Sequence, residues 1–530
     1  GTAGCRAGVV VALKCVARAL RPCGCFTVNL ILLSCPLLSN FLFCLFYSAL
    51  PVCDPVILLR LTFGDDTGQL LPALSSTVVW CEGQSVFTTL NVRSLRRAFS
   101  FFSPSFLLQT SGRWKSTFFF LRCTHTPRIE IMRRLNCAVQ NYAWGKRGKD
   151  SMVSKLKMME NEGFETDEDK TYAELWMGTH PNGPSRVMPE PGDFSEGAEE
   201  GHAGIFLIEL LETHPHYLGD LQEQGDLPFM FKVLSINKAL SVQAHPDKKL
   251  AERLYATRPD LYKDDNHKPE MAVALSDFEG LCGFRPFEEI VFNLHRYPEL
   301  RGLVSLSAMR AMCSLPEDPE DQRDALRKLF QSYITAKPEV VATQVNALVQ
   351  RLGERADDGG FLSDESLDLM RRLSKEYPGD IGIMMPLLLN YLRMGEGESF
   401  FMAANEPHAY LKGDIMEVMA RSDNVVRVAL TPKHRDVPLL CEILTYNMGA
   451  PPIVAPIQVD QCCHRFTPPI KDFELDDMKV PEGGEYTPLA IPVPSICMVL
   501  EGVGSASDGV RDTVLRPGVV VFVAARSVAT

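Results

Sequence analysis

The stretch from Phe231 to Glu270 contains three segments that set the expectations for the rest of the chain: FKVLS (231–235), LSVQAHP (240–246) and NHKPEMA (266–272). The first is apolar and β-branched with polar interruptions, which predicts a strand. Gln243 and His245 are two residues apart, so on a strand their side chains leave the same face. Glu270 adds a carboxylate directly after a proline that fixes the local backbone. An amide, an imidazole and a carboxylate are all candidate metal ligands.

The pattern of a histidine near a glutamine is not specific, because such a histidine is more often a hydrogen-bonded surface or core residue than a ligand. Two features favour a metal site. Lys232, Ser241 and Lys268 flank the same stretch, and cationic and hydroxyl groups beside a metal suit a phosphorylated substrate. A second histidine, His408, occurs far downstream in the similar setting NEPHAY (405–410).

Charge is unevenly divided along the 530 residues, whose formal net charge is −12. Residues 1–131 hold 12 Lys and Arg against 5 Asp and Glu, whereas residues 132–530 hold 42 against 61. A body this acidic argues against nucleic acid as a partner, because phosphate backbones require a positive surface. An anionic small molecule remains compatible if the flanking lysines form a local basic pocket.

Cysteine shows the same break in the chain. Nine of the 16 cysteines precede residue 132, and the other seven include no Cys-x-x-Cys pair, only the adjacent Cys462 and Cys463. A thiolate zinc site is therefore not expected, and a reducing, cytoplasmic setting is the default.

Residues 1–131 begin with glycine and contain none of the chain's 20 methionines. Residues 26–59 carry a single charge, Asp54, after a basic segment, which by hydropathy is a signal-anchor or transmembrane candidate. Pro36 and Pro51 interrupt this run, and no small-residue cleavage site follows it. We interpret residues 1–131 as translated upstream non-coding sequence or a disordered hydrophobic extension, with Met132 as the initiator. A membrane partner is expected only if this segment is genuine.

The segment from Tyr172 to Pro181 has two interpretations. It is either a half-buried edge strand or the wall of a substrate cleft. Glu174 and His180 are separated by an even number of residues, so an extended segment would place them on one face.

Helical periodicity dominates residues 286–385, with apolar spacing typical of helices at 287–294, 324–335 and 339–352. Ser363 is a candidate cap for a further helix. After Ser399 the β pattern resumes, and beyond Pro438 short apolar runs separated by Pro and Gly suggest a jelly roll.

From Cys137 onward the sequence resembles the type I phosphomannose isomerases, which are mannose-6-phosphate isomerases. The motifs that carry the resemblance occur in order over most of residues 135–525: 140–145, 172–181, 240–247, 266–272, 281–286, 407–414 and 422–433. The family implies a mainly β fold of cupin-type jelly-roll domains with an inserted α-helical domain. The expected parts are a catalytic cupin domain in two pieces, an insertion and a truncated C-terminal β domain: 132–285 with 386–440, 286–385 and 441–530.

The resemblance also implies the chemistry. It implies one zinc ion per chain and interconversion of mannose 6-phosphate and fructose 6-phosphate through an enediol, by a cytoplasmic monomer that supplies GDP-mannose synthesis. By match to the motifs, the zinc ligands are Gln243, His245, Glu270 and His408. The catalytic residues are Arg427, which would stabilise the enediolate, and Glu417 and Lys268, between which the choice of base is open. The substrate-binding residues are Lys232, Ser241, Tyr410, Glu174 and His180.

Two departures and two alternatives accompany this reading. Val428 and Ala429 follow Arg427 where the family has Ala-Gly, and Ile415 replaces a smaller residue, so either change could crowd the site. One alternative function is a non-catalytic metal-bound cupin that binds or senses sugar phosphates. The other, an iron dioxygenase, is disfavoured because Gln in place of a third His does not suit O₂ activation.

Overall fold

The computed structural model describes residues 131–189, 204–354 and 364–527, together with eight short strands between residues 9 and 119. The chain forms two compact units, one of residues 1–19 and 129–530 and the other of residues 20–128. In the second unit, the described strands pair in chain order as β2–β3, β4–β5–β6 and β7–β8, which span Ile31–Leu33, Phe43–Leu45, Leu58–Gly64, Leu70–Cys81, Gln84–Val86, Phe106–Ser111 and Trp114–Phe119. Among the described residues no helix has both the length and the apolar character that a membrane crossing requires.

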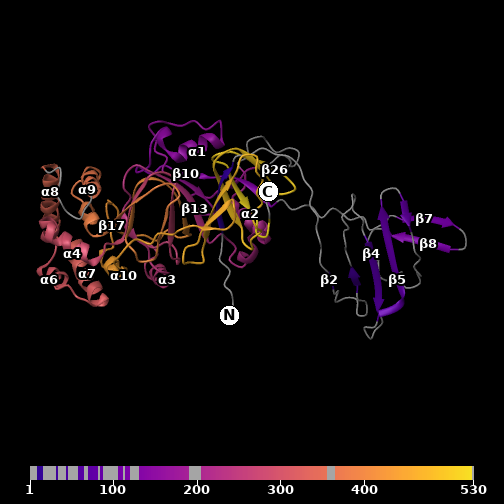
Figure 1. The fold of residues 1–530 in the computed structure, drawn as a ribbon, viewed down its shortest axis with the longest axis horizontal. Coiled ribbons are helices and arrows are strands. Elements are labelled where there is room, and N and C mark those ends of the chain that lie inside the picture. Colours follow the sequence, from indigo (N-terminus) through magenta and orange to yellow (C-terminus); the bar gives the residue numbers. More distant parts are fainter. Residues whose placement is uncertain are drawn as a thin grey trace. The chain divides into compact units, whose positions relative to one another are not determined.

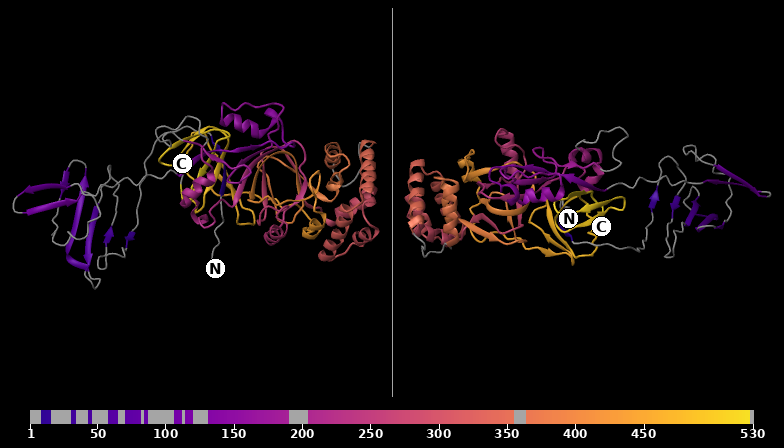
Figure 2. Two further views of the ribbon diagram at one scale, coloured as in Figure 1. Left: turned by 180° about the vertical axis from the view of Figure 1, so that it is seen from behind. Right: turned by 90° about the horizontal axis from the view of Figure 1, so that it is seen from above.

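The larger unit is built around two antiparallel β-layers that share one long strand, β19 (His408–Ala420). In Figures 1 and 2 the strands at the middle of this unit lie between the helices of residues 287–376 at one end and the C-terminal strands, in yellow, at the other. The first layer has the order β10 (Ala138–Gln140), β11 (Glu174–Met177), β13 (Phe229–Ile236), β19, β15 (Glu270–Ala274) and β18 (Ser399–Met402). The second has the order β20 (Val426–Ala429), β14 (Val242–Ala244), β19, β16 (Phe278–Phe284) and β17 (Leu389–Met394). Strand β13 confirms the strand that was predicted from the FKVLS segment.

Strand β19 passes from one layer to the other at Gly413. Its N-terminal half pairs with β14 and β16, and its C-terminal half pairs with β13 and β15. Gly413 has a φ of 115°, and a Cβ at this position would lie 2.5 Å from the carbonyl oxygen of Asp277. Only glycine fits this backbone conformation and this close approach. The bend allows His408 and Glu417, nine residues apart, to serve one site from two layers.

Apolar clusters lie between the two layers and on the outer face of each. Side chains of both layers, among them Leu234, Ile415 and Phe278, meet in one buried cluster. The opposite face of the first layer packs on helices α1 (Met152–Glu160) and α2 (Leu207–Thr213) and on the C-terminal sheet. The opposite face of the second layer packs on the helical insertion. The strands that carry the charged groups described below are therefore held rigidly by packing on both faces of each layer.

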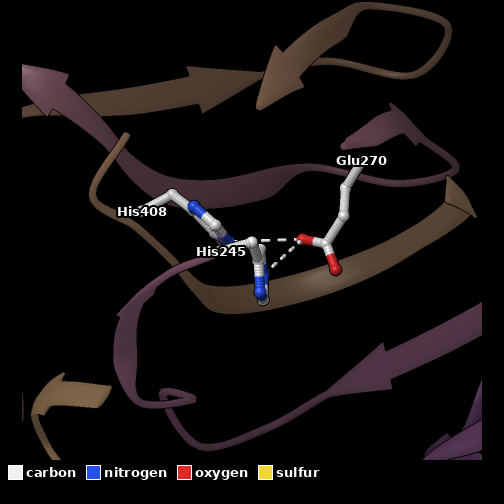
Figure 3. Close-up of side chains that lie close together, drawn as sticks. All are labelled: His245, Glu270 and His408. Carbon is white, nitrogen blue, oxygen red and sulfur yellow. Dashed lines mark ion pairs between the residues drawn. The ribbon is translucent and has the colours of Figure 1, made fainter. Parts of the chain in front are cut away.

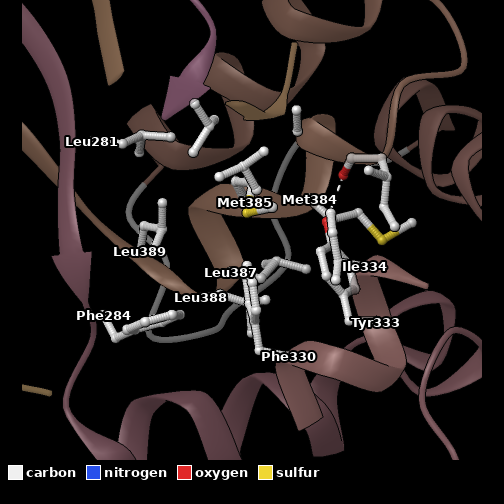
Figure 4. Packing of buried hydrophobic residues seen from close by; sticks show 14 of the residues in the cluster. Leu281, Phe284, Phe330, Tyr333, Ile334, Met384, Met385, Leu387, Leu388 and Leu389 are labelled. Atoms are coloured by element: carbon white, nitrogen blue, oxygen red, sulfur yellow. Dashed lines mark hydrogen bonds between the residues drawn. The ribbon is translucent and has the colours of Figure 1, made fainter. Parts of the chain in front are cut away.

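In its described residues, the helical insertion has six helices followed by a 3₁₀ turn, η4 (Ile381–Leu387). The helices are α4 (Phe287–Arg296), α5 (Pro298–Gly302), α6 (Leu306–Cys313), α7 (Pro319–Ile334), α8 (Pro338–Glu354) and α9 (Asp364–Glu376). The predicted helices are present, although α7 begins earlier than the apolar spacing indicated because Asp318 caps it. The Ser363 cap lies outside the described residues. Phe330 and Tyr333 of α7 meet Leu387 and Leu389 in the buried contact with the β-layers (Figure 4).

The C-terminal sheet has the order β12 (Arg186–Val187), β9 (Met132–Asn136), β27 (Val520–Val523), β24 (Ser495–Glu501), β1 (Val9–Cys15), β23 (Glu474–Val480), β22 (Cys463–Phe466) and β21 (Ile457–Gln458). Two of its strands, β9 and β12, come from the segment assigned by sequence to the catalytic domain. Strand β1 lies between β24 and β23 and runs parallel to both. A short hairpin of β25 (Gly504–Ser507) and β26 (Asp512–Leu515) completes this region. Helix α10 (Val437–Ile443) lies instead against β20 and α7, and its Leu439 and Leu440 belong to the apolar cluster of the helical insertion.

Candidate metal centre

Three side chains from separate strands converge at one buried point (Figure 3). His245 follows β14 directly, Glu270 begins β15 and His408 begins β19. The Oε2 atom of Glu270 lies 3.4 Å from Nε2 of His245 and 3.2 Å from Nε2 of His408. Zinc bonds of about 2.0–2.1 Å in a tetrahedral arrangement would separate ligand atoms by about 3.3 Å. The spacing therefore suits a zinc ion.

Each imidazole is oriented by a backbone carbonyl. Nδ1 of His245 lies 2.7 Å from the carbonyl oxygen of Asn424, and Nδ1 of His408 lies 3.1 Å from that of Glu406. A carbonyl can only accept, so each Nδ1 carries the proton and each Nε2 presents a lone pair. Both Nε2 atoms and Oε2 of Glu270 are buried without a hydrogen-bond partner. Three convergent acceptors with no donor between them are suited to a cation.

The electrostatic surroundings keep these ligands in the form that binds metal. Burial lowers the pKa of His245 to about 4, against the opposing attraction of Glu270, so the ring is neutral at pH 7. Burial alone would raise the pKa of Glu270, but Lys268 and His245 outweigh it and hold the pKa well below its usual range. The Nζ of Lys268 lies 3.1 Å from Oε1 of Glu270, the oxygen that faces away from the histidines. Neutral imidazole and ionised carboxylate are the states that metal binding needs.

Gln243 lies between the metal cluster and Arg427. It is paired directly with His408 on β19 and with Arg427 on β20. Directly opposed residues of antiparallel strands project from the same face. The side chains of His408, Gln243 and Arg427 therefore form a row across the second layer. This register brings the predicted fourth ligand next to the first three.

A second charged group lies on the first layer beside the metal cluster. The Nζ of Lys232 is 2.9 Å from Oε2 of Glu417 and 3.5 Å from Oε2 of Glu174. The hydroxyl of Tyr410 donates to Oε1 of Glu417 at 2.8 Å, and the indole N–H of Trp176 donates to Oε2 of Glu174. Lys232, Glu417 and Trp176 lie opposite one another on adjacent strands, which puts them on one face.

Opposing effects act on the two central groups of this network. Burial raises the pKa of the Glu417 carboxyl, and the negative charge of Glu270 adds to this rise, whereas Lys232 opposes it. Burial would lower the pKa of Lys232, but Glu417 and Glu174 outweigh it and raise the pKa above its ordinary value. Glu417 is thus a carboxylate of raised pKa beside a metal site, which is the character of a proton-transfer group.

Arg427 is half-buried, and among the residues that the structure describes it has no ion-pair partner. Burial lowers its pKa, yet a guanidinium stays charged in proteins. Val428, by contrast, faces the opposite side of β20 and is buried in the cluster shared with the helical insertion. The departure at Val428 and Ala429 is thus accommodated in the core, and so is Ile415 in the cluster between the layers. An uncompensated cation beside a cation site is suited to an anionic ligand.

Two further predicted residues, His180 and Ser241, lie just outside strands β11 and β14. Strand β11 is interior, between β10 and β13, so the edge-strand alternative for 172–181 is wrong. The strand ends at Met177, and His180 follows Gly178, whose φ of 143° breaks the extended conformation. His180 lies edge-on to Trp176 and 3.3 Å from Asp423 through Nε2, so it does not join the Lys232 network directly. Ser241 is half-buried just before β14, two residues before Gln243.

Sequence reasoning missed the residues that orient the others. The indole of Trp176 orients Glu174. The backbone carbonyl of Glu406 orients His408, and that of Asn424 orients His245. Backbone carbonyls leave no side-chain signature. Asn424 lies inside the recognised motif 422–433 and Glu406 inside the NEPHAY segment (405–410), but neither segment indicates which carbonyl contacts a histidine.

Comparisons with known proteins agree with this geometry. Residues 132–287 match the family described as phosphomannose isomerase type I, catalytic domain, and residues 300–389 match its helical insertion domain. The chain is 40% identical over 402 residues to the mannose-6-phosphate isomerase of Homo sapiens, covering 74% of this chain and 93% of that protein. It is also 40% identical over 398 residues to mannose-6-phosphate isomerase 1 of Arabidopsis thaliana, covering 74% of this chain and 89% of that protein.

Solved structures of phosphomannose isomerases are also similar to this chain. A zinc-bound mannose 6-phosphate isomerase superimposes with a TM-score of 0.63 at 29% identity, covering 76% of this chain and 96% of that one. A variant of the phosphomannose isomerase from Salmonella typhimurium gives the same TM-score, identity and coverage. The similarity therefore spans both the β-layers and the helical insertion.

Proposed function

Because this chain belongs to the type I phosphomannose isomerase family, we propose that its buried centre interconverts mannose 6-phosphate and fructose 6-phosphate with one zinc ion. The observation that carries the proposal is the convergence of His245, Glu270 and His408 with three unpaired acceptor atoms. The zinc-bound relative of similar fold supports the choice of metal. The product would supply GDP-mannose synthesis.

The reaction moves a proton between C1 and C2 of the sugar through an enediol. A carbon next to a carbonyl is a weak acid, so the charge that develops on oxygen must be stabilised. His245, Glu270, His408 and Gln243 would hold the zinc ion, which when bound would supply a Lewis acid for that oxygen. The buried surround strengthens each charge interaction because water is excluded.

Arg427 supplies the second fixed positive charge. It lies across Gln243 from His408 and is free of a carboxylate partner in the described part of the chain. It is therefore available to the enediolate or to another anionic group of the substrate. Lys232, in contrast, is held between Glu417 and Glu174, so its main effect is on those carboxylates.

Glu417 is the better supported of the two candidate bases. Its raised pKa brings proton transfer closer to neutral pH, and Tyr410 and Lys232 fix its two oxygens. Lys268 is engaged with the metal-ligand carboxylate of Glu270. In this assignment Glu417 carries the proton between C1 and C2, while Lys268 stabilises the ionised form of Glu270. Glu174, His180, Ser241 and Tyr410 complete the substrate pocket.

The proposal extends to the fold type and the setting of the enzyme. The two antiparallel layers that share β19 support a cupin-type jelly roll for the catalytic domain. The cysteines from Cys137 to Cys497 are free thiols, which supports a reducing, cytoplasmic compartment. A single chain supplies every residue of the site, which is compatible with a monomer.

The test measures isomerisation of mannose 6-phosphate by the full chain before and after treatment with a chelator. We expect activity to disappear on chelation and to return when zinc is added. The variant H408A should lose both zinc and activity, whereas H464A, on β22 of the C-terminal sheet, should keep both. A protein that binds zinc and sugar phosphate without turnover would favour the alternative, a non-catalytic cupin.

A further inference from the structure

The carbonyl oxygen that orients His245 belongs to a segment without regular secondary structure. Residues 422–425 precede β20 and form no strand, so no sheet ladder holds the Asn424 carbonyl in place. Asn424 is nevertheless almost completely buried, at 1% exposure. Something other than the sheet must therefore fix the atom that sets the tautomer and tilt of this histidine.

Asp264 provides that constraint. The side-chain Nδ2 of Asn424 donates to the carbonyl oxygen of Asp264 at 2.7 Å and to its Oδ1 at 3.1 Å. The hydroxyl of Ser422 donates to the same Oδ1 at 2.7 Å, and the backbone N–H of Asp423 donates to Oδ2 at 2.7 Å. One carboxylate thus binds three consecutive residues of the segment that carries the Asn424 carbonyl.

Asn266 also binds the segment that carries the Asn424 carbonyl. Its carbonyl oxygen accepts from Ser422 Oγ at 3.1 Å and from Asn424 Nδ2 at 3.0 Å, and its Nδ2 donates to the carbonyl oxygen of Arg421 at 3.0 Å. Its backbone N–H donates to Oδ1 of Asp264 at 3.0 Å. We call Asp264, Asn266, Ser422 and Asn424 the Asp264 clamp. Residues 264–266 and 421–424 are joined by it along their whole length.

Both joined segments lead directly into the site. Residues 264–266 precede Lys268 and Glu270, and residues 421–424 precede Arg427. Through the Asn424 carbonyl the clamp also reaches His245. A single carboxylate outside the metal cluster is therefore connected to a metal-ligand histidine, to the loop before the metal-ligand glutamate and to the strand of the candidate catalytic arginine.

We propose that Asp264 is a positioning residue that sets the orientation of His245, and through it the affinity of the metal centre. This inference rests on the proposed function, because it takes the centre to bind zinc. Partners in the shell around metal ligands typically contribute about 10–100-fold to metal affinity. Without the carboxylate, Ser422, Asn424 and the Asp423 N–H each lose an acceptor, and the backbone carbonyls of Asp264 and Asn266 are left to hold the segment. The Asn424 carbonyl is then fixed less tightly.

The experiment compares D264A and D264N with D265A and D265N in the full chain. Asp265 is the neighbouring carboxylate, which is exposed and whose side chain lies 3.8 Å from Lys248, away from the clamp. Each pair of substitutions at Asp264 and Asp265 changes the charge equally. The readouts are zinc affinity by competition with a chromophoric chelator, the visible spectrum of the Co²⁺-substituted protein, and the melting temperature of the metal-free chain.

We expect D264A to bind zinc about 10–100-fold more weakly than wild type, with an altered Co²⁺ spectrum. D264N should lose less, because its amide oxygen still accepts from Ser422 and Asn424. Both Asp265 variants should match wild type. If D264A does not fold, D264N against D265N decides: weaker zinc binding at an unchanged metal-free melting temperature supports the proposal.

Zinc affinity and a Co²⁺ spectrum equal to wild type in the folded Asp264 variants would overturn the positioning role and leave the proposed function intact. Failure of the wild-type chain to bind zinc at all would overturn both. A fall in zinc affinity that the Asp265 variants share would also overturn the proposal, because it would then reflect net charge.

Discussion

Lys232 and Glu417 are directly opposed on β13 and β19, and their charged groups are 2.9 Å apart in a site from which water is almost excluded. Lys232 also faces Glu174 at 3.5 Å, so it neutralises two buried carboxylates at once. Its removal would leave both uncompensated. We therefore expect this lysine to control the charge of the candidate base.

We predict that K232M shifts the acidic limb of the kcat/KM profile to higher pH. Lys232 lowers the pKa of Glu417 against the effect of burial, so its loss raises that pKa further, and the base is protonated over more of the pH range. Breaking a buried ion pair should also cost about 3–5 kcal/mol of stability. K149M, at an exposed lysine, is the charge-matched control. An unshifted acidic limb would remove Glu417 from the role of base.

Substitution of Arg427 should separate catalysis from metal binding. R427Q removes the unpaired cation beside the metal cluster, and we expect kcat to fall about 10²–10³-fold, as when one fixed group that stabilises transition-state charge is lost. R427K should recover part of the rate, because it restores charge without the planar guanidinium. Zinc content by elemental analysis should stay at the wild-type level in both. Wild-type turnover in R427Q would show that the guanidinium does not face the reacting atoms.

The junction between the β-layers and the helical insertion contains a pH-dependent contact. Glu279 on β16 accepts from Arg372 on α9 and, at 2.7 Å, from the Tyr391 hydroxyl. Burial alone would raise the pKa of Glu279, but these donors outweigh it and lower the pKa. A lowered folded-state pKa contributes stability above the unfolded value of about 4.3, and this contribution is lost as the pH falls through the folded value.

We therefore predict that E279Q reduces the free energy of unfolding by about 1–2 kcal/mol at pH 7, after allowance for partial exposure. The difference from wild type should shrink as the pH is lowered below about 4. Urea unfolding of both metal-free proteins across this range gives the comparison. The control is E398Q, because in the wild type the Glu398 carboxylate accepts from the Gly395 backbone N–H in an exposed turn. A difference that is constant with pH would contradict the assignment.

The bend of β19 gives a prediction about stability. In G413A the new Cβ would lie 2.5 Å from the Asp277 carbonyl and 2.8 Å from Cα of Phe278, so backbone must move. At Gly397 the φ is also positive, at 85°, but no atom lies within 4 Å of the added Cβ. G397A should therefore cost about 1 kcal/mol from strain alone, and G413A should cost more. Equal melting temperatures for the two variants would contradict the close packing at the bend.

The sequence by itself determined the local features of this protein. Period-two alternation indicated that Gln243 and His245 share a face, helical spacing marked the insertion, and the motifs supplied the ligand types. These features are readable because they depend on neighbours within a few residues, where backbone geometry fixes the relation between side chains.

Only the tertiary structure decided which groups meet and which atoms they present. Gln243 and His408 are 165 residues apart, and their pairing depends on strand register, which a local pattern does not encode. The partners of Lys232 also depend on strand register. The sequence predicted this lysine as a substrate contact, and the fold holds it between the carboxylates of Glu174 and Glu417. The backbone carbonyl of Asn424 selects the metal-binding nitrogen of His245, and a carbonyl oxygen has the same chemistry in every residue, so its role arises from position alone.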